Sequence, residues 1–205
     1  MVVGETSLAP GSCAAISLAG GTARRDGRPE IELRSVIVGG RMRGVPDLLW
    51  SEVESFFAPD AMGALPDCSV ADTTVEDWQA LFDLVRSRGW MWEFSVGGVA
   101  RRLPTAAEVL WRPTDAEYAL LRVRPDPAVR AVFRLASATD IDFDVDLREL
   151  HDQAGVDALC GFLRAIGRRL GKPVTMSPEG DFDHPVLGFD PAADRVVLLA
   201  DPRLG

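Results

Sequence analysis

The segment 140–146, with the sequence DIDFDVD, most strongly constrains the fold of this chain. Its apolar residues Ile141, Phe143 and Val145 alternate with aspartates. Successive side chains of a β-strand point to opposite faces, so this alternation predicts a strand with one apolar and one acidic face. The fold must therefore contain a sheet that buries one face of this strand.

Further strands are predicted on both sides of this segment. Residues 119–124 and 129–135 are rich in apolar side chains, and Pro125-Asp126-Pro127 provides a turn between them. Two strands joined by so short a turn run antiparallel, which predicts a mainly antiparallel sheet. The remaining predicted strands are residues 13–19, 30–38, 90–96, 107–112, 173–177, 185–189 and 195–200.

Two amphipathic helices are marked by apolar residues that recur three and four positions apart. The first lies between Thr73 and Gly89, and Thr73 has the spacing of a capping box with Glu76. The second begins near Gly155 and ends before Gly171. We expect both helices to pack an apolar face on the sheet.

A third, shorter helical pattern extends from Pro46 to Pro59. It is followed by residues 58–72, which contain two prolines and a glycine and show little periodicity. We predict that this stretch is a loop.

Together these elements predict an α+β fold, with a mainly antiparallel sheet packed against two or three amphipathic helices. We expect one domain over residues 1–205. A helix followed by strands occurs in both halves of the chain, and a few residues of the first half recur in the second. A tandem of two similar halves, 1–112 and 113–205, is therefore the alternative.

The charge balance restricts the classes of partner. The chain carries 31 acidic and 22 basic side chains, which gives a formal net charge of −9. Nucleic-acid phosphates and anionic membranes both require a basic surface. We therefore expect neither of these partners, and we expect a protein partner to present a basic surface.

The cysteines and the N-terminal sequence indicate the compartment. Cys13, Cys68 and Cys160 are far apart and odd in number, which fits neither a disulfide framework nor a zinc site. Such usage is typical of a reducing compartment. No basic residue precedes Arg24, and no apolar run reaches the length of a membrane span. We expect a cytoplasmic protein.

Common catalytic motifs are not found in the sequence. It contains no GxGxxG, Walker, HExxH, GxSxG or SxxK pattern, and His151 and His184 lie in unrelated contexts. We therefore predict no catalytic residues and no cofactor, and we expect a protein that is not an enzyme.

One loop nevertheless combines several metal-ligating side chains. The segment 179–184 (EGDFDH) places three carboxylates and an imidazole between two predicted strands. Glu179, Asp181, Asp183 and His184 are therefore candidate ligands for a hard cation or zinc, which would acidify a bound water. Acidic residues around a glycine are also typical of a solvated loop, which is the simpler interpretation.

The acidic face of segment 140–146 has two interpretations. Carboxylates on one strand face lie about 7 Å apart and repel one another unless they are neutralised. Cross-strand ion pairs would neutralise them with four upstream arginines, Arg122, Arg124, Arg130 and Arg134. If part of the row is unpaired, it would instead bind a basic partner. The candidate partner-binding residues are Asp140, Asp142, Asp144 and Asp146.

The last third of the chain carries a resemblance to a known class. Its features are the DIDFDVD strand, the helix VDALCGFLRAIGRRLGK, and the strings PVTMSPEGD and HPVLGFDP. In element order and in these strings it resembles small acidic α+β immunity proteins of bacterial polymorphic toxin systems. The resemblance implies a stoichiometric binder whose acidic surface blocks a basic site on a toxin.

Three hypotheses for the function follow. The first is a non-enzymatic binding protein that uses an acidic surface to bind a protein partner, in the manner of an immunity protein. The second is a metal-assisted hydrolase that uses the loop from Glu179 to His184. The third is a structural subunit of a larger assembly. The sequence leaves the oligomeric state open.

Overall fold

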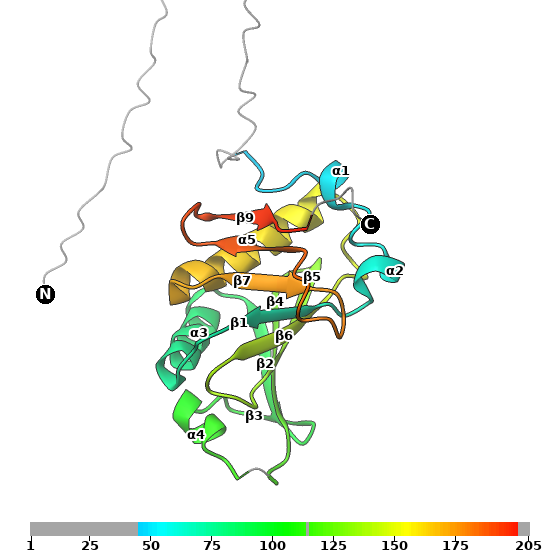
Figure 1. Cartoon of the computed structure of the whole chain (residues 1–205). Coiled ribbons are helices and arrows are strands. Elements are labelled where there is room, and N and C mark those ends of the chain that lie inside the picture. Colours follow the sequence, from blue (N-terminus) through cyan, green and yellow to red (C-terminus); the bar gives the residue numbers. More distant parts are fainter. Residues whose placement is uncertain (1–44, 114, 201–205) are drawn as a thin grey trace, which may run out of the picture. The chain divides into compact units, whose positions relative to one another are not determined.

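The computed structural model describes residues 45–113 and 115–200, all of which belong to one compact unit. Helices and strands alternate irregularly along this part of the chain (Figure 1). The helices are α1 (Trp50–Val53), α2 (Pro59–Met62), α3 (Val75–Ser87), α4 (Ala106–Leu110) and α5 (Gln153–Leu170). The strands are β1 (Asp67–Val70), β2 (Met91–Val96), β3 (Val99–Arg101), β4 (Ala119–Asp126), β5 (Val129–Arg134), β6 (Ile141–Asp146), β7 (Val174–Ser177), β8 (Leu187–Asp190) and β9 (Arg195–Leu198).

All of these strands join one sheet, in the order β3-β2-β4-β5-β6-β1-β7-β8-β9. Every neighbouring pair in it is antiparallel. The predicted α+β fold with a mainly antiparallel sheet is therefore confirmed. Because β2 pairs with β4 and β1 pairs with β6 and β7, strands from before and after residue 112 are hydrogen-bonded neighbours.

Helix α5 covers one face of this sheet, and α3 packs beside it. In Figure 1 the sheet extends from β9 to β3, with α5 behind the strands and α3 beside it. Helix α5 packs on β4, β5, β7, β8 and β9 and also contacts α3, which in turn contacts α4. Beneath α5, the rings of Phe133 and Phe143 stack with centroids 4.6 Å apart, and both meet Phe162 edge to face. This aromatic cluster forms the centre of the core.

Two of the sequence-based predictions were wrong. The predicted loop 58–72 contains β1, which lies between β6 and β7 and buries Cys68 and Val70. A four-residue strand that directly follows Pro66 gives too few positions for an alternation to be visible. The predicted strand 107–112 is instead helix α4, whose first turn is fixed by a capping box between Thr105 and Glu108.

Other predicted elements differ from the structure in their extent. The helical pattern from Pro46 to Pro59 forms only the short helix α1, which is followed by turns. Strand β3 was not predicted, because its three residues are all exposed and show no apolar alternation. The predicted strands 13–19 and 30–38 lie outside the described residues.

The cap of α3 is one residue later than the sequence suggested. Thr74, and not Thr73, accepts the hydrogen bond from the Asp77 amide at 3.3 Å, and the Asp77 carboxylate accepts from the Thr74 amide at 3.0 Å. Thr73 is buried and donates its hydroxyl to the carbonyl oxygen of Ala138 at 3.0 Å. The hydroxyl of Thr74 is therefore the group that satisfies the first turn of the helix.

We expect Thr74→Ala to lower the free energy of unfolding by about 1 kcal/mol, because it removes this capping acceptor. The control is Thr74→Ser, which keeps the hydroxyl and is expected to behave like the native chain. Urea unfolding followed by circular dichroism measures both variants. A cap at Thr74 is disproved if alanine and serine give the same midpoint.

Candidate binding face

The face of the sheet opposite the helices carries polar and charged side chains, and we call it the open face. Along each strand, the side chains that point toward α5 are buried. Most of the alternate side chains, which point to the open face, are partly or fully exposed. The register places these residues in two rows across the sheet. One row is Glu93, Arg122, Val132, Asp144, Asp67 and Ser177, and the other is Ser95, Leu120, Arg134, Asp142, Ser69 and Thr175.

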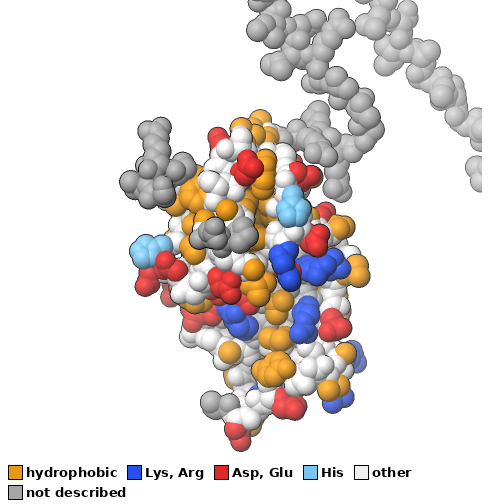
Figure 2. Space-filling view, turned by 90° about the vertical axis from the view of Figure 1, so that its right-hand side faces the viewer, with side chains coloured by type: hydrophobic (Ala, Val, Ile, Leu, Met, Phe, Trp, Pro, Cys, Tyr) orange, Lys and Arg blue, Asp and Glu red, His pale blue; other side chains and the backbone are white. Residues whose placement is uncertain are grey.

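Charge is distributed unevenly over the open face. Strands β4 and β5 carry arginines at 122, 124, 130 and 134, whereas β6 and β1 carry aspartates at 142, 144, 146 and 67. In Figure 2, basic side chains gather beside hydrophobic ones, with acidic side chains around them. Arg134 lies where the two groups meet.

At this boundary Arg134 bridges two carboxylates that are mostly buried. Its Nη1 donates to both carboxylate oxygens of Asp144 at 2.6 and 2.7 Å, and its Nη2 donates to Asp67 at 2.8 Å. The Asp67 side chain is only 8% exposed and that of Asp144 is 19% exposed. Burial and the neighbouring Asp67 carboxylate raise the pKa of Asp144, although Arg134 acts in the opposite direction. One positively charged guanidinium thus pairs with two carboxylates, so negative charge is in excess around Arg134.

The aspartates predicted to bind a partner have different environments. Asp140 accepts hydrogen bonds from the hydroxyls of Thr139 at 2.7 Å and Ser137 at 3.4 Å. Asp142 is half-buried, and the described residues offer it no ion pair or hydrogen bond. The structure thus brings the three aspartates of β6 onto the open face, and it provides direct partners for only part of the row.

Asp146 is paired by an arginine that sequence reasoning missed. Arg148 donates its Nε and Nη2 to the Asp146 carboxylate at 2.9 and 2.6 Å, and its backbone amide donates at 3.1 Å. The hydrogen bonds from Arg148 hold the pKa of Asp146 below its usual range. Of the four upstream arginines, only Arg134 makes a direct ion pair with the row, so the predicted cross-strand neutralisation is partial.

The candidate metal-binding loop is arranged differently from a metal site. Glu179 Oε2 accepts the backbone amides of Ala64 and Leu65 at 3.1 and 3.2 Å, so this carboxylate fastens the segment before β1. Asp181 contacts His184 Nδ1 at 2.9 Å, and this hydrogen bond raises the pKa of the exposed histidine. Among residues 45–113 and 115–200, no three His, Cys, Asp or Glu side chains are grouped to hold a metal ion. The structure does not bring the four predicted ligands together.

The two described cysteines are buried thiols. Cys68 is a buried residue of strand β1, and burial raises the pKa of its thiol well above the usual value. Burial likewise raises the pKa of Cys160, on α5, to about 12. A reactive cysteine requires an accessible thiolate, so neither residue has the properties of a nucleophile.

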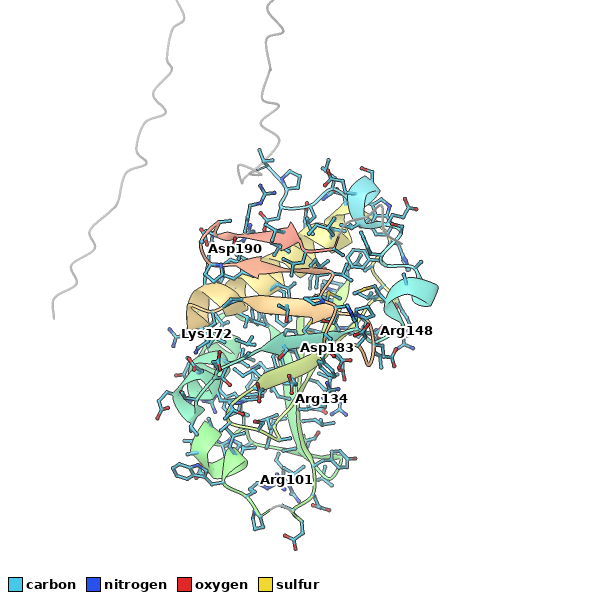
Figure 3. All side chains as sticks on the ribbon, in the orientation of Figure 1. Arg101, Arg134, Arg148, Lys172, Asp183 and Asp190 are labelled. Carbon is cyan, nitrogen blue, oxygen red and sulfur yellow. The ribbon has the colours of Figure 1, made fainter. Side chains whose placement is uncertain are left out.

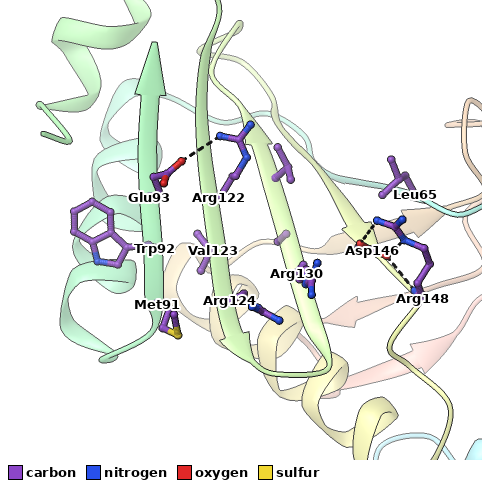
Figure 4. Close-up of a pocket in the computed structure, with 12 residues that line it drawn as sticks. Leu65, Met91, Trp92, Glu93, Arg122, Val123, Arg124, Arg130, Asp146 and Arg148 are labelled. Atoms are coloured by element: carbon purple, nitrogen blue, oxygen red, sulfur yellow. Dashed lines mark hydrogen bonds and ion pairs between the residues drawn. The ribbon is translucent and has the colours of Figure 1, made fainter. Parts of the chain in front are cut away.

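A groove of about 640 Å³ lies over β2, β4, β5 and β6, and we call it the arginine groove. Its cationic lining residues are Arg122, Arg124, Arg130 and Arg148. Figure 4 shows Arg124 and Arg130 on neighbouring strands. The ion pair of Arg122 with Glu93 lies on one side of them, and the ion pair of Arg148 with Asp146 lies on the other. Exposed apolar side chains border it at Leu65, Met91 and Trp92. Sequence reasoning treated these arginines only as counterions for the aspartates.

No helix within the described part of the chain has the length and apolar character needed to cross a bilayer. Comparison with models of known protein families, with curated proteins and with solved structures gives no match for this chain.

Proposed function

We propose that this chain is a non-enzymatic binding protein that holds a protein partner on the open face of its sheet. The supporting observation is the asymmetry of the sheet. Helices α3 and α5 lie on one side, and the other side presents charged side chains across several strands. A broad, charged sheet surface that no described helix covers suits a protein partner better than a small substrate.

The acidic half of the open face indicates which charge the surface of the partner should carry. We define the acidic zone as Asp67, Asp142 and Asp144 on β1 and β6, together with Asp181 and Asp183 in the loop after β7. The loop is fastened to β1 because the Gly180 amide donates to the Asp67 carboxylate at 2.8 Å. Arg134 and His184 are the basic side chains bonded within this zone, so negative charge exceeds positive charge there. Charge complementarity then favours a partner with a basic surface.

The class of binder proposed is the toxin-neutralising immunity protein. This rests on the resemblance of the last third of the chain, together with the acidic zone, which a basic toxin site would complement. The buried, free thiols of Cys68 and Cys160 agree with a reducing compartment, and we propose the cytoplasm as its location.

The test measures association with a partner captured from cells of the source organism by the immobilised chain. Asp142→Lys reverses a charge that makes no ion pair in the described structure, so its effect on folding is expected to stay within about 1 kcal/mol. If the acidic zone guides the partner, this variant should associate about tenfold more slowly at low salt, and the difference should shrink as salt rises.

Asp83→Lys is the matched control, because it makes the same charge change on the exposed surface of α3. We expect this control to associate at the native rate apart from a small general charge effect. Equal slowing in both variants would contradict binding on the open face, and so would failure of the immobilised chain to retain any protein at micromolar concentration.

A further inference from the structure

The arginine groove contains two arginines that face each other across an irregularity in the sheet. The register of β4 and β5 shifts between Val123, which is opposite Ala131, and Asp126, which is opposite Val129. Within this bulge, Arg124 of β4 stands across from Arg130 of β5. Like charges at opposed positions in a sheet repel each other, and bulges commonly aim side chains at functional sites.

Arg124 is the less satisfied of these two guanidinium groups, since Arg130 is exposed and lies opposite Asp146. The Nε atom of Arg124 is buried and lacks a hydrogen-bond partner among the described residues, and neither Arg124 nor Arg130 lies within ion-pair distance of a described carboxylate. The carboxylates beside them already form ion pairs with other arginines. Glu93 Oε1 lies 3.5 Å from Arg122 Nη1, and Asp146 pairs with Arg148. A buried arginine nitrogen without a hydrogen-bond acceptor destabilises a fold unless another group accepts a hydrogen bond from it.

The groove has the size and the lining of a small-molecule site. Its volume of about 640 Å³ lies within the range of ligand pockets. Met91 is 71% exposed at one side and Leu65 is 38% exposed at the other. Four arginines against two carboxylates give the groove a positive excess, in a chain whose net charge is −9. An anion is repelled by most of the surface of such a chain and is attracted at this groove.

We propose that the arginine groove binds a small polyvalent anion with two or more carboxylate or phosphate groups. Arg124 and Arg130 donate to its oxygens from the centre of the groove, since planar guanidinium groups match carboxylate and phosphate geometry. Arg122 and Arg148 add charge at the two ends. Anion binding in this groove does not require the protein partner proposed above, and its test uses the chain without a protein partner.

The test is calorimetric titration of the full chain with citrate and, separately, with pyrophosphate, at low ionic strength. These two probes distinguish carboxylate from phosphate selectivity. We expect one saturable site for at least one probe, and about tenfold weaker binding in both Arg124→Met and Arg130→Met, because each variant removes a charge-assisted hydrogen bond.

Arg101→Met is the matched control, since Arg101 is exposed on the edge strand β3, away from Arg148 and Asp183 (Figure 3). It should bind the probe as the native chain does. Equal weakening in this control would overturn the proposal, and so would the lack of saturation with both probes. Thermal melting without added anion gives a second readout. If Arg130 serves the anion, Arg130→Met should melt no lower than Arg101→Met, and a clearly lower midpoint would show that its role is structural.

Discussion

Replacing Arg134 by leucine should lower the free energy of unfolding by about 2 to 3 kcal/mol at neutral pH. The substitution leaves Asp67 and Asp144 close together without the guanidinium that both now share. Removing one partner of a buried ion pair costs about 3 to 5 kcal/mol. The value expected here is smaller because the Arg134 side chain is itself 39% exposed.

The pH dependence of this loss identifies its cause. Burial and Asp67 already raise the pKa of Asp144, and without Arg134, which lowers it, the pKa of Asp144 should rise further in the folded chain. A carboxyl group with a raised folded pKa destabilises the protein above that pKa, and protonation removes the cost at lower pH. The difference between native and Arg134→Leu should therefore shrink as the pH falls from about 7 to about 4.5.

The matched control is Arg122→Leu, since Arg122 is an exposed arginine on the same face whose ion pair with Glu93 is longer, at 3.5 Å. Its loss should stay within about 1 kcal/mol. Urea unfolding at several pH values measures both variants. The shared-arginine explanation fails if the two substitutions cost the same, or if the Arg134→Leu deficit grows on acidification.

Gly167→Ala should destabilise the protein by about 2 kcal/mol, although alanine is the better helix former. Gly167 lies on α5 where the helix meets β8, and a Cβ atom there would lie 2.0 Å from Cδ1 of Phe189. Phe189 is buried in the core and its ring cannot move aside without disturbing its neighbours. The close approach of helix and sheet therefore depends on the missing side chain.

Gly161→Ala provides the control on the same helix, because a Cβ atom there would meet nothing within 4 Å. It should stabilise the protein by about 0.5 to 1 kcal/mol through helix propensity alone. Chemical unfolding of both variants measures the opposite signs. Two alanines with equal effects would show that α5 does not press on β8 at Gly167.

Long periodic segments made most of the fold predictable. Helix α5 and strand β6 each bury one regular face, so their sequences show the period of the structure. Strand β1 was missed although it is central, because its pairing with β6 and β7 is decided by residues distant in sequence. Helix α4 was missed because its local capping box outweighs the strand-like pattern of 107–112.

The candidate site was predictable only in part. The alternation of segment 140–146 predicts its aspartates on one face, and the register confirms this for Asp142, Asp144 and Asp146, whereas Asp140 precedes β6. The pairing of those aspartates could not be predicted. Asp67 joins Arg134 from a strand that the sequence did not reveal, and Arg148 reaches Asp146 from the turn after β6. The placement of Arg124 near Arg130 depends on the register of β4 and β5 and on its shift before Asp126, which the sequence does not show.

Carboxyl footprinting tests the central claim, that the partner binds on the open face, most directly. Carbodiimide labelling, read by mass spectrometry, compares the free chain with the chain bound to its captured partner. We expect the partner to protect Asp142, Asp181 and Asp183, whereas Asp83 on α3 keeps its labelling. Protection of Asp83 with unchanged labelling of the acidic zone would contradict the claim.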